Sequence, residues 1–174
     1  MRRIAIIGNA GGGKSVLARA LGSALRLPVH TVDDVQWRPG WTRAPLSEVA
    51  ATHDAWLAAP AWVIDGWGNW ALIEARFVAA DRIVVVDFPL WRHRWWAARR
   101  QVEAALGLRR DWPPPGCRAL PATRRLWRVM TQVHEELRPR LLALVAEPRF
   151  AARAVVLRSP AELEAFRHAA CGTT

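Results

Sequence analysis

Lysine, tyrosine and cysteine are scarce in this 174-residue sequence. Lys14 is the only lysine among 25 Lys and Arg residues, tyrosine is missing, and there are two cysteines. Cys117 and Cys171 are too few for a disulfide framework or a paired-cysteine metal site, so we expect two thiols in a reducing compartment. No apolar run reaches the roughly 18 residues of a membrane span, and the N-terminal apolar run is too short for a signal peptide. We therefore expect a cytoplasmic protein without a membrane partner.

Acidic residues are also outnumbered. Fifteen Asp and Glu against 25 Lys and Arg give a formal net charge of +10, which suits nucleic acid, an anionic membrane surface or small anionic substrates. Biased coding DNA would give the same preference for arginine, so charge alone does not choose among these partners. A hydrophobic content of 52% and a charged content of 23% indicate one globular domain, residues 1–174. We expect a monomer or a homodimer, and the sequence does not choose between them.

Short apolar runs alternate with helical stretches along the chain. Buried strands are predicted at 3–7, 27–34, 61–65, 82–88 and 153–159. Helices are predicted at 14–26, 46–58, 69–80, 90–106, 122–146 with a kink at Pro139, and from 160 onward, while 37–41 is expected to be loop. This alternation predicts an α/β fold, a five-stranded parallel sheet with helices on both faces. Ligands bind such sheets at the carboxyl ends of the strands.

The segment GNAGGGKS, residues 8–15, has the spacing G-x-x-x-x-G-K-S between a strand and a helix, which is the P-loop (Walker A) pattern. Glycines let successive N–H groups curl around a phosphate, and the helix N-terminus adds partial positive charge. Lys14 would reach the β- and γ-phosphates, and the Ser15 hydroxyl would bind Mg²⁺. The predicted ATP-binding residues are Gly8, Asn9, Ala10, Gly11, Gly12, Gly13, Lys14, Ser15 and Val16.

Later motifs follow in the order TVDDVQWRPGW, WVIDGW, VVVDFP, WRHRWWAARRQ, PGCRAL and VVLRS. Together with the P-loop, this order resembles a bacterial family labelled topology modulation protein or adenylate-kinase-like, in the nucleoside-monophosphate-kinase-like group. The resemblance covers nearly the whole chain. It implies a P-loop NTPase fold with a short lid, and an Mg·ATP-dependent kinase acting on a nucleoside monophosphate or another small acceptor. The family commonly has D-G-N-Y where this chain has Asp65-Gly66-Trp67-Gly68, so the acceptor stays open.

The resemblance places the strand that ends at Asp65 beside the P-loop strand. A carboxylate there would hold Mg²⁺ together with Ser15; the alternative is that Asp65 caps the helix after Gly68. Asp87 precedes Phe88-Pro89 and fits a helix cap better than a catalytic role.

Acceptor contacts are predicted from Asp33, Arg38 and Arg76. Asp33 and Asp34 close the second predicted strand, where an acid could orient an acceptor hydroxyl, although a solvated acidic turn explains them equally. Arg76 could contact the acceptor or be an ordinary surface arginine.

An arginine-rich helix precedes a proline-rich segment, 107–121, which we expect to form a mobile lid. In kinases of this class lid arginines stabilise the transferred phosphoryl group, and closure excludes water. Arg99, Arg100 and Arg110 are the predicted catalytic arginines, while a solvated basic helix face would explain the rest of the cluster.

Tryptophan is abundant, with 11 residues against four phenylalanines. Trp37, Trp41, Trp67 and Trp70 fall near the predicted acceptor site and could stack on a planar group. Core packing is expected for Trp56, Trp62 and Trp127, and the histidines 53, 93 and 134 are expected to be ordinary surface or half-buried residues. The stretch WRHRWW would also suit nucleic acid, so the alternative function is an ATP-binding regulator that contacts nucleic acid.

Overall fold

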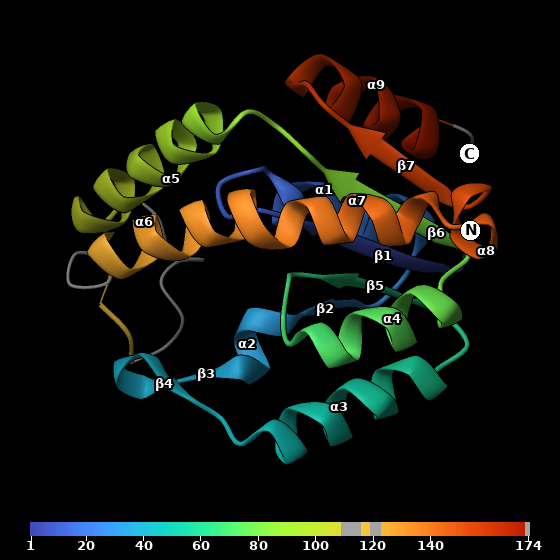
Figure 1. Cartoon of the computed structure of the whole chain (residues 1–174), viewed down its shortest axis with the longest axis horizontal. Helices are drawn as coiled ribbons and strands as arrows, with labels where there is room; N and C mark the ends of the chain where they lie inside the picture. Colours follow the sequence, from blue (N-terminus) through green and yellow to red (C-terminus); the bar gives the residue numbers. More distant parts are fainter. Residues whose placement is uncertain (109–115, 119–122, 173–174) are drawn as a thin grey trace.

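The computed structural model describes residues 1–108, 116–118 and 123–172, and it has the predicted α/β architecture (Figure 1). Five parallel strands form the main sheet in the order β2-β5-β1-β6-β7. Their bounds are β1 (Arg3–Gly8), β2 (Val29–Thr31), β5 (Trp62–Asp65), β6 (Arg82–Val86) and β7 (Ala154–Leu157). The P-loop strand β1 is the central strand, so the loop that follows it lies at the carboxyl edge of the sheet between the ends of β5 and β6.

Helices cover both faces of this sheet because each β-strand sends alternate side chains to opposite sides. Ile4 and Ile6 of β1 belong to one core cluster, and Ala5 and Ile7 belong to the other. The first cluster packs on α1 (Lys14–Leu25) and α9 (Pro160–Cys171). The second packs on α4 (Trp70–Ala79), α7 (Arg138–Ala146) and α8 (Pro148–Ala151), and α3 (Leu46–Ala58) lies against α4.

The second predicted strand is shorter than expected. β2 ends at Thr31, and Asp33 and Asp34 lie in the first turn of a short helix, α2 (Val32–Gln36). Two carboxylates in a first turn favour a helix because they complement its positive end. The expected loop at 37–41 instead contains β3 (Trp37–Arg38) and η1 (Pro39–Trp41), and β3 pairs antiparallel with β4 (Thr42–Arg43).

The long helix predicted at 122–146 is found in three parts. α6 (Thr123–Gln132) is followed by a π-helical turn, η3 (Val133–Leu137), and then by α7. Pro139 has no N–H and its ring displaces the carbonyl four residues earlier, so a wider turn before it accommodates the ring. The predicted kink therefore takes the form of a π-turn. Ahead of it in the chain, α5 (Leu90–Ala105) packs against α6.

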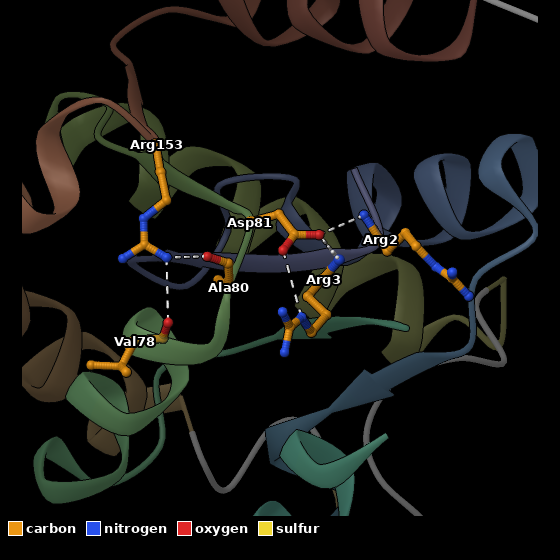
Figure 2. A network of polar contacts seen from close by, with 6 residues as sticks. All are labelled: Arg2, Arg3, Val78, Ala80, Asp81 and Arg153. Carbon is orange, nitrogen blue, oxygen red and sulfur yellow. Dashed lines mark hydrogen bonds and ion pairs between the residues drawn. The ribbon is translucent and has the colours of Figure 1, made fainter. Parts of the chain in front are cut away.

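A polar network fastens the end of the sheet opposite the P-loop (Figure 2). The Asp81 carboxylate accepts hydrogen bonds from the backbone N–H groups of Arg2 at 2.8 Å and Arg3 at 2.9 Å. Burial opposes ionisation of Asp81, but these two bonds and the Arg3 charge lower its pKa. Arg153 donates to the carbonyls of Val78 and Ala80. In the described part of the chain no helix combines the length and apolar character of a bilayer span.

Candidate functional site

The loop after β1 has a shape that only glycine permits at two of its positions. Gly8 and Gly11 have φ of 149° and 73°, in the region that L side chains rarely adopt. A Cβ on Gly8 would lie 2.3 Å from the Val86 carbonyl oxygen, and one on Gly11 would lie 2.3 Å from the His93 carbonyl oxygen. The loop is therefore pressed against β6 on one side and against α5 on the other.

Hydrogen bonds within the loop fix its curvature. The Asn9 side-chain oxygen accepts from the Ala10 N–H at 2.9 Å, and the Lys14 Nζ donates to the Asn9 carbonyl at 2.9 Å. The Asn9 amide group also donates to the Met130 carbonyl of α6 at 2.7 Å. Asn9 thus connects the loop to α6, a contact that the sequence pattern does not reveal.

The loop leads directly into the N-terminus of α1. Gly13, with φ of 78°, is the N-cap residue, and no side chain caps the helix there. The first turn of α1 contains no acid, so no side chain of the helix itself offsets the partial positive charge of its N-terminus. Val16 follows in this turn and its side chain is exposed. An anion at this end of α1 would meet N–H groups, the helix dipole and Lys14 together.

Ser15 and Asp65 are brought together as the sequence predicts. Asp65 ends β5 directly beside Ile6 of β1, and its Oδ2 accepts a hydrogen bond from the Ser15 hydroxyl at 2.5 Å. Asp65 is only 1% exposed, and its Oδ1 has no hydrogen-bond partner among the described residues. The capping alternative is wrong, because the Asn69 side chain caps α4 by accepting from the Ala71 N–H.

The free oxygen of Asp65 and the Ser15 hydroxyl are the hard donors that Mg²⁺ prefers. Among the described residues no group of three or more His, Cys, Asp and Glu side chains could hold a metal ion. The protein would therefore supply few ligands and leave the others to water and phosphate oxygens, which is typical of Mg²⁺ in nucleotide sites. The residues present fit Mg²⁺ bound with a nucleotide.

The charges of Lys14, Asp33 and Asp65 influence one another. Burial lowers the pKa of Lys14, the two carboxylates counteract this shift, and the Arg100 charge adds to it. Burial raises the pKa of Asp33 and Asp65 adds to the shift, whereas Lys14, Arg100 and a hydrogen bond from the Trp37 side chain oppose it. Asp33 therefore lies near Lys14 although it belongs to α2 and not to the end of a strand.

The two predicted acceptor arginines, Arg76 and Arg38, are engaged in contacts within the protein. Arg76 is 1% exposed, and its Nη1 and Nη2 donate to the carbonyls of Gly66 and Trp67 at 2.9 Å each. Burial lowers its pKa to about 10, against the opposing effect of Asp65. Arg76 is thus a buried support of the loop after β5 and not a surface residue. Arg38 is exposed and pairs with Glu48 of α3.

The three predicted catalytic arginines differ in position. Arg100 is half-buried on α5 and is close enough to Lys14 and Asp33 to influence the pKa of both. Arg99 has a side chain that is 71% exposed and is paired with Glu103 at 2.7 Å, one turn further along the same helix. Arg110 lies outside the described residues, as does most of the predicted lid 107–121.

Asp87 does not cap α5 as expected, because the residue at the cap is Pro89 and no side chain caps this helix. Its carboxylate instead accepts two hydrogen bonds from Arg138 of α7, one of them at 2.9 Å. The pair ties the end of β6 to the start of α7. Trp127 is also not a core residue, since it lies with Trp91, Arg94, Trp95 and Ala98 along a groove on the surface of α5 and α6.

Two histidines expected near the surface are buried. His53 and His93 are each 1% exposed. Burial lowers the pKa of both to about 4, helped by the charge of Arg76 for His53 and of Lys14 for His93. The pattern on α5 could have revealed His93, because it shares a helical stripe with the buried Ala97 and Gln101.

Comparison with solved structures shows the fold of P-loop kinases. A gluconokinase from Sinorhizobium meliloti 1021 matches with a TM-score of 0.56 and 16% identity, over 98% of this chain and 90% of that one. A shikimate kinase from Acinetobacter baumannii in complex with shikimate matches with a TM-score of 0.57 and 12% identity, over 100% and 95%. A sugar kinase from Janibacter sp. HTCC2649 gives 0.51 and 12%, over 97% and 93%. No family model and no curated protein sequence matches this chain. The P-loop kinase fold is therefore shown by structure alone.

Proposed function

We propose that this protein is an ATP-dependent kinase that phosphorylates a hydroxyl group of a small molecule. The observation that carries the proposal is the group formed by Lys14, Ser15, Asp65 and Asp33 at one end of the sheet. Lys14, Ser15 and Asp65 would bind a nucleoside triphosphate together with Mg²⁺. The fourth, Asp33, is a carboxylate on a separate element, α2, whose charge interacts with that of Lys14.

The chain's own residues divide the work in this proposal. The loop N–H groups and the α1 N-terminus bind the phosphates, and Lys14 neutralises charge on the β- and γ-phosphates. Ser15 and Asp65 would hold Mg²⁺, which supplies Lewis-acid polarisation of the phosphoryl group when it is bound. Arg100 of α5, whose charge influences both Lys14 and Asp33, would stabilise the transferred phosphoryl group.

The charge on the acceptor side favours a hydroxyl over a phosphate acceptor. A nucleoside monophosphate would bring its phosphate toward Asp33 and Asp65, and like charges at short range repel. Arg76 would not offset this repulsion by binding the acceptor phosphate, because its Nη1 and Nη2 already donate to the carbonyls of Gly66 and Trp67. A hydroxyl group, in contrast, can donate a hydrogen bond to the Asp33 carboxylate.

The proposed transfer step is a single displacement. The acceptor oxygen forms a bond to the γ-phosphorus while the bond between that phosphorus and the β–γ bridging oxygen breaks. The hydroxyl proton passes to the Asp33 carboxylate and ADP leaves. The raised pKa of Asp33 makes its carboxylate a better proton acceptor than an exposed aspartate.

Turnover with a panel of acceptors tests the proposal. ADP release would be measured with Mg·ATP and sugar acids, shikimate, polyols or nucleoside monophosphates, and we expect stimulation by a hydroxylated non-nucleotide compound. Asp33→Asn should reduce the stimulated rate by about 10²- to 10⁴-fold and leave slow ATP hydrolysis in place. Asp34→Asn is the matched control, because the neighbouring Asp34 side chain is exposed.

Two results would count against the proposal. One is stimulation by nucleoside monophosphates alone, which would make the acceptor a phosphate. The other is an Asp33→Asn variant as active as the Asp34→Asn variant, which would remove Asp33 from the transfer step.

A further inference from the structure

His93 is a buried side chain with contacts to two separate segments. It lies on α5, and its ring stacks on Phe88 with centroids 5.6 Å apart. The backbone N–H of Phe88 donates to the His93 Nε2 at 3.2 Å, and the His93 Nδ1 lies 3.0 Å from the Ala10 carbonyl oxygen of the P-loop. One imidazole therefore joins the end of β6 to the phosphate-binding loop.

The partners of His93 determine where its proton lies. A backbone N–H can only donate, so Nε2 must be the acceptor in the bond with Phe88. The neutral ring then carries its hydrogen on Nδ1, where it can donate to the Ala10 carbonyl. Both ring nitrogens are thus used in the neutral state, and one tautomer is selected by the fold.

The direction of the Ala10 carbonyl determines the direction of the Gly11 N–H. In a trans peptide the C=O of one residue and the N–H of the next point in opposite directions. Holding the Ala10 oxygen on His93 therefore turns the Gly11 N–H away from α5. Gly11 already lies so close to α5 that a Cβ added to it would be 2.3 Å from the His93 carbonyl oxygen. The loop therefore has little room to move toward α5.

We propose that His93 is a positioning residue for nucleotide binding, acting through its Nδ1–H bond to the Ala10 carbonyl, which aims the Gly11 N–H into the phosphate site. The inference rests on the proposed use of the P-loop for a nucleotide. A P-loop motif requires no histidine at this distance in the sequence, 83 residues from Ala10. The bond also makes the loop depend on α5, the helix that carries Arg100.

Two amide substitutions separate the two bonds of His93. The Asn side-chain nitrogen can take the place of Nδ1, so His93→Asn keeps a donor for the Ala10 carbonyl and loses the acceptor for Phe88. The Gln side chain reaches the place of Nε2, so His93→Gln keeps the acceptor for Phe88 and loses the donor for Ala10. Each variant leaves one backbone group without its partner, either the buried Phe88 N–H or the part-buried Ala10 carbonyl, so both variants should lose thermal stability.

The test is the affinity of each folded variant for a fluorescent ADP analogue, measured beside its melting temperature. We expect His93→Gln to bind on the order of tenfold more weakly than the wild type, and His93→Asn to recover most of that loss. Trp91→Ala is the control on the same helix, because Trp91 is 62% exposed.

Each outcome is decisive. Equal affinities for the Asn and Gln variants would show that His93 acts only through packing and would overturn the inference, while the proposed function would stand. A wild-type protein that does not bind the analogue would overturn the proposed function and the inference together. Should one amide variant fail to fold, His93→Phe replaces the imidazole with an apolar aromatic ring and removes both bonds, and an unchanged affinity in that variant would overturn the inference.

Discussion

Asp65→Asn is the sharpest single test of the metal and nucleotide site. The substitution keeps the shape of the side chain and an oxygen that can accept a hydrogen bond from Ser15. It removes the negative charge of a residue that is 1% exposed and that interacts electrostatically with Lys14. If Asp65 holds Mg²⁺, the variant loses a preorganised charge in the transition state, which costs about 3–4 kcal/mol, or roughly a 10²- to 10³-fold fall in kcat. The Mg²⁺ concentration for half-maximal activity should rise as well.

Stability should respond differently. Asp65 Oδ1 has no hydrogen-bond partner among the described residues, so removing the charge relieves a burial cost. The attraction of this charge to Lys14 and Arg76 is lost at the same time, and because the two effects oppose each other the free energy of unfolding should change little. Asp87→Asn is the matched control, since Asp87 is also buried, at 8% exposure, and follows β6, the strand on the other side of β1 from β5. Its carboxylate forms an ion pair with Arg138, so Asp87→Asn should lower the free energy of unfolding without changing the Mg²⁺ requirement.

The assays are ADP release across a Mg²⁺ titration and thermal melting of both variants at neutral pH. The reasoning about Asp65 would be refuted if Asp65→Asn melted early while its turnover and Mg²⁺ dependence stayed those of the wild type. That pattern would make Asp65 a structural carboxylate whose only task is to hold Ser15.

Three further predictions concern Arg100, His53 and Lys14. Arg100→Ala should lower turnover by roughly 10²-fold, while Arg99→Ala, exposed and paired with Glu103, should behave like the wild type; equal effects would place the arginine effect in the helix as a whole. Because the folded pKa of His53 is about 4 and its ordinary value is 6.5, the unfolded state binds more protons between these values, so stability is complete above pH 6.5 and is lost as pH falls toward 4, by at most about 1.4 kcal/mol per pH unit. His53→Leu should reduce that loss in urea unfolding experiments at pH 7 and pH 5, and an unchanged pH dependence would exclude His53 as its source. Lys14→Arg should abolish nearly all turnover in a folded protein, and substantial activity would show that the site accepts a guanidinium.

The sequence predicts the parts of the site that depend on local spacing. The P-loop pattern places Lys14 and Ser15 because eight consecutive residues, 8–15, determine that geometry. The five apolar runs predict the sheet because buried parallel strands need continuous hydrophobic segments. The resemblance adds the position of Asp65 beside β1, a pairing between strands far apart in the chain that local pattern cannot supply.

Other features depend on contacts that no local pattern encodes. The sequence suggests a strand running to Asp34, but the strand ends at Thr31, since β2 is an edge strand with one neighbour, β5, and a helix turn can begin as soon as that pairing stops. Burial of Arg76 follows from two carbonyls of its own preceding loop that need donors. The role of His93 depends on the approach of α5 to the P-loop, which is a matter of tertiary packing.

The chain's use of lysine and arginine follows the demands of each position. At exposed pairs such as Arg99 with Glu103, either cation would serve, and such pairs contribute little to stability. Arg76 must satisfy two carbonyls at once, which a planar fork does and an ammonium does less well. Lys14 donates to the Asn9 carbonyl in a half-buried space shared with two carboxylates, where a wide guanidinium would displace the loop that binds the phosphate. A sequence that otherwise uses arginine throughout therefore retains lysine at the one position where a compact charge is required.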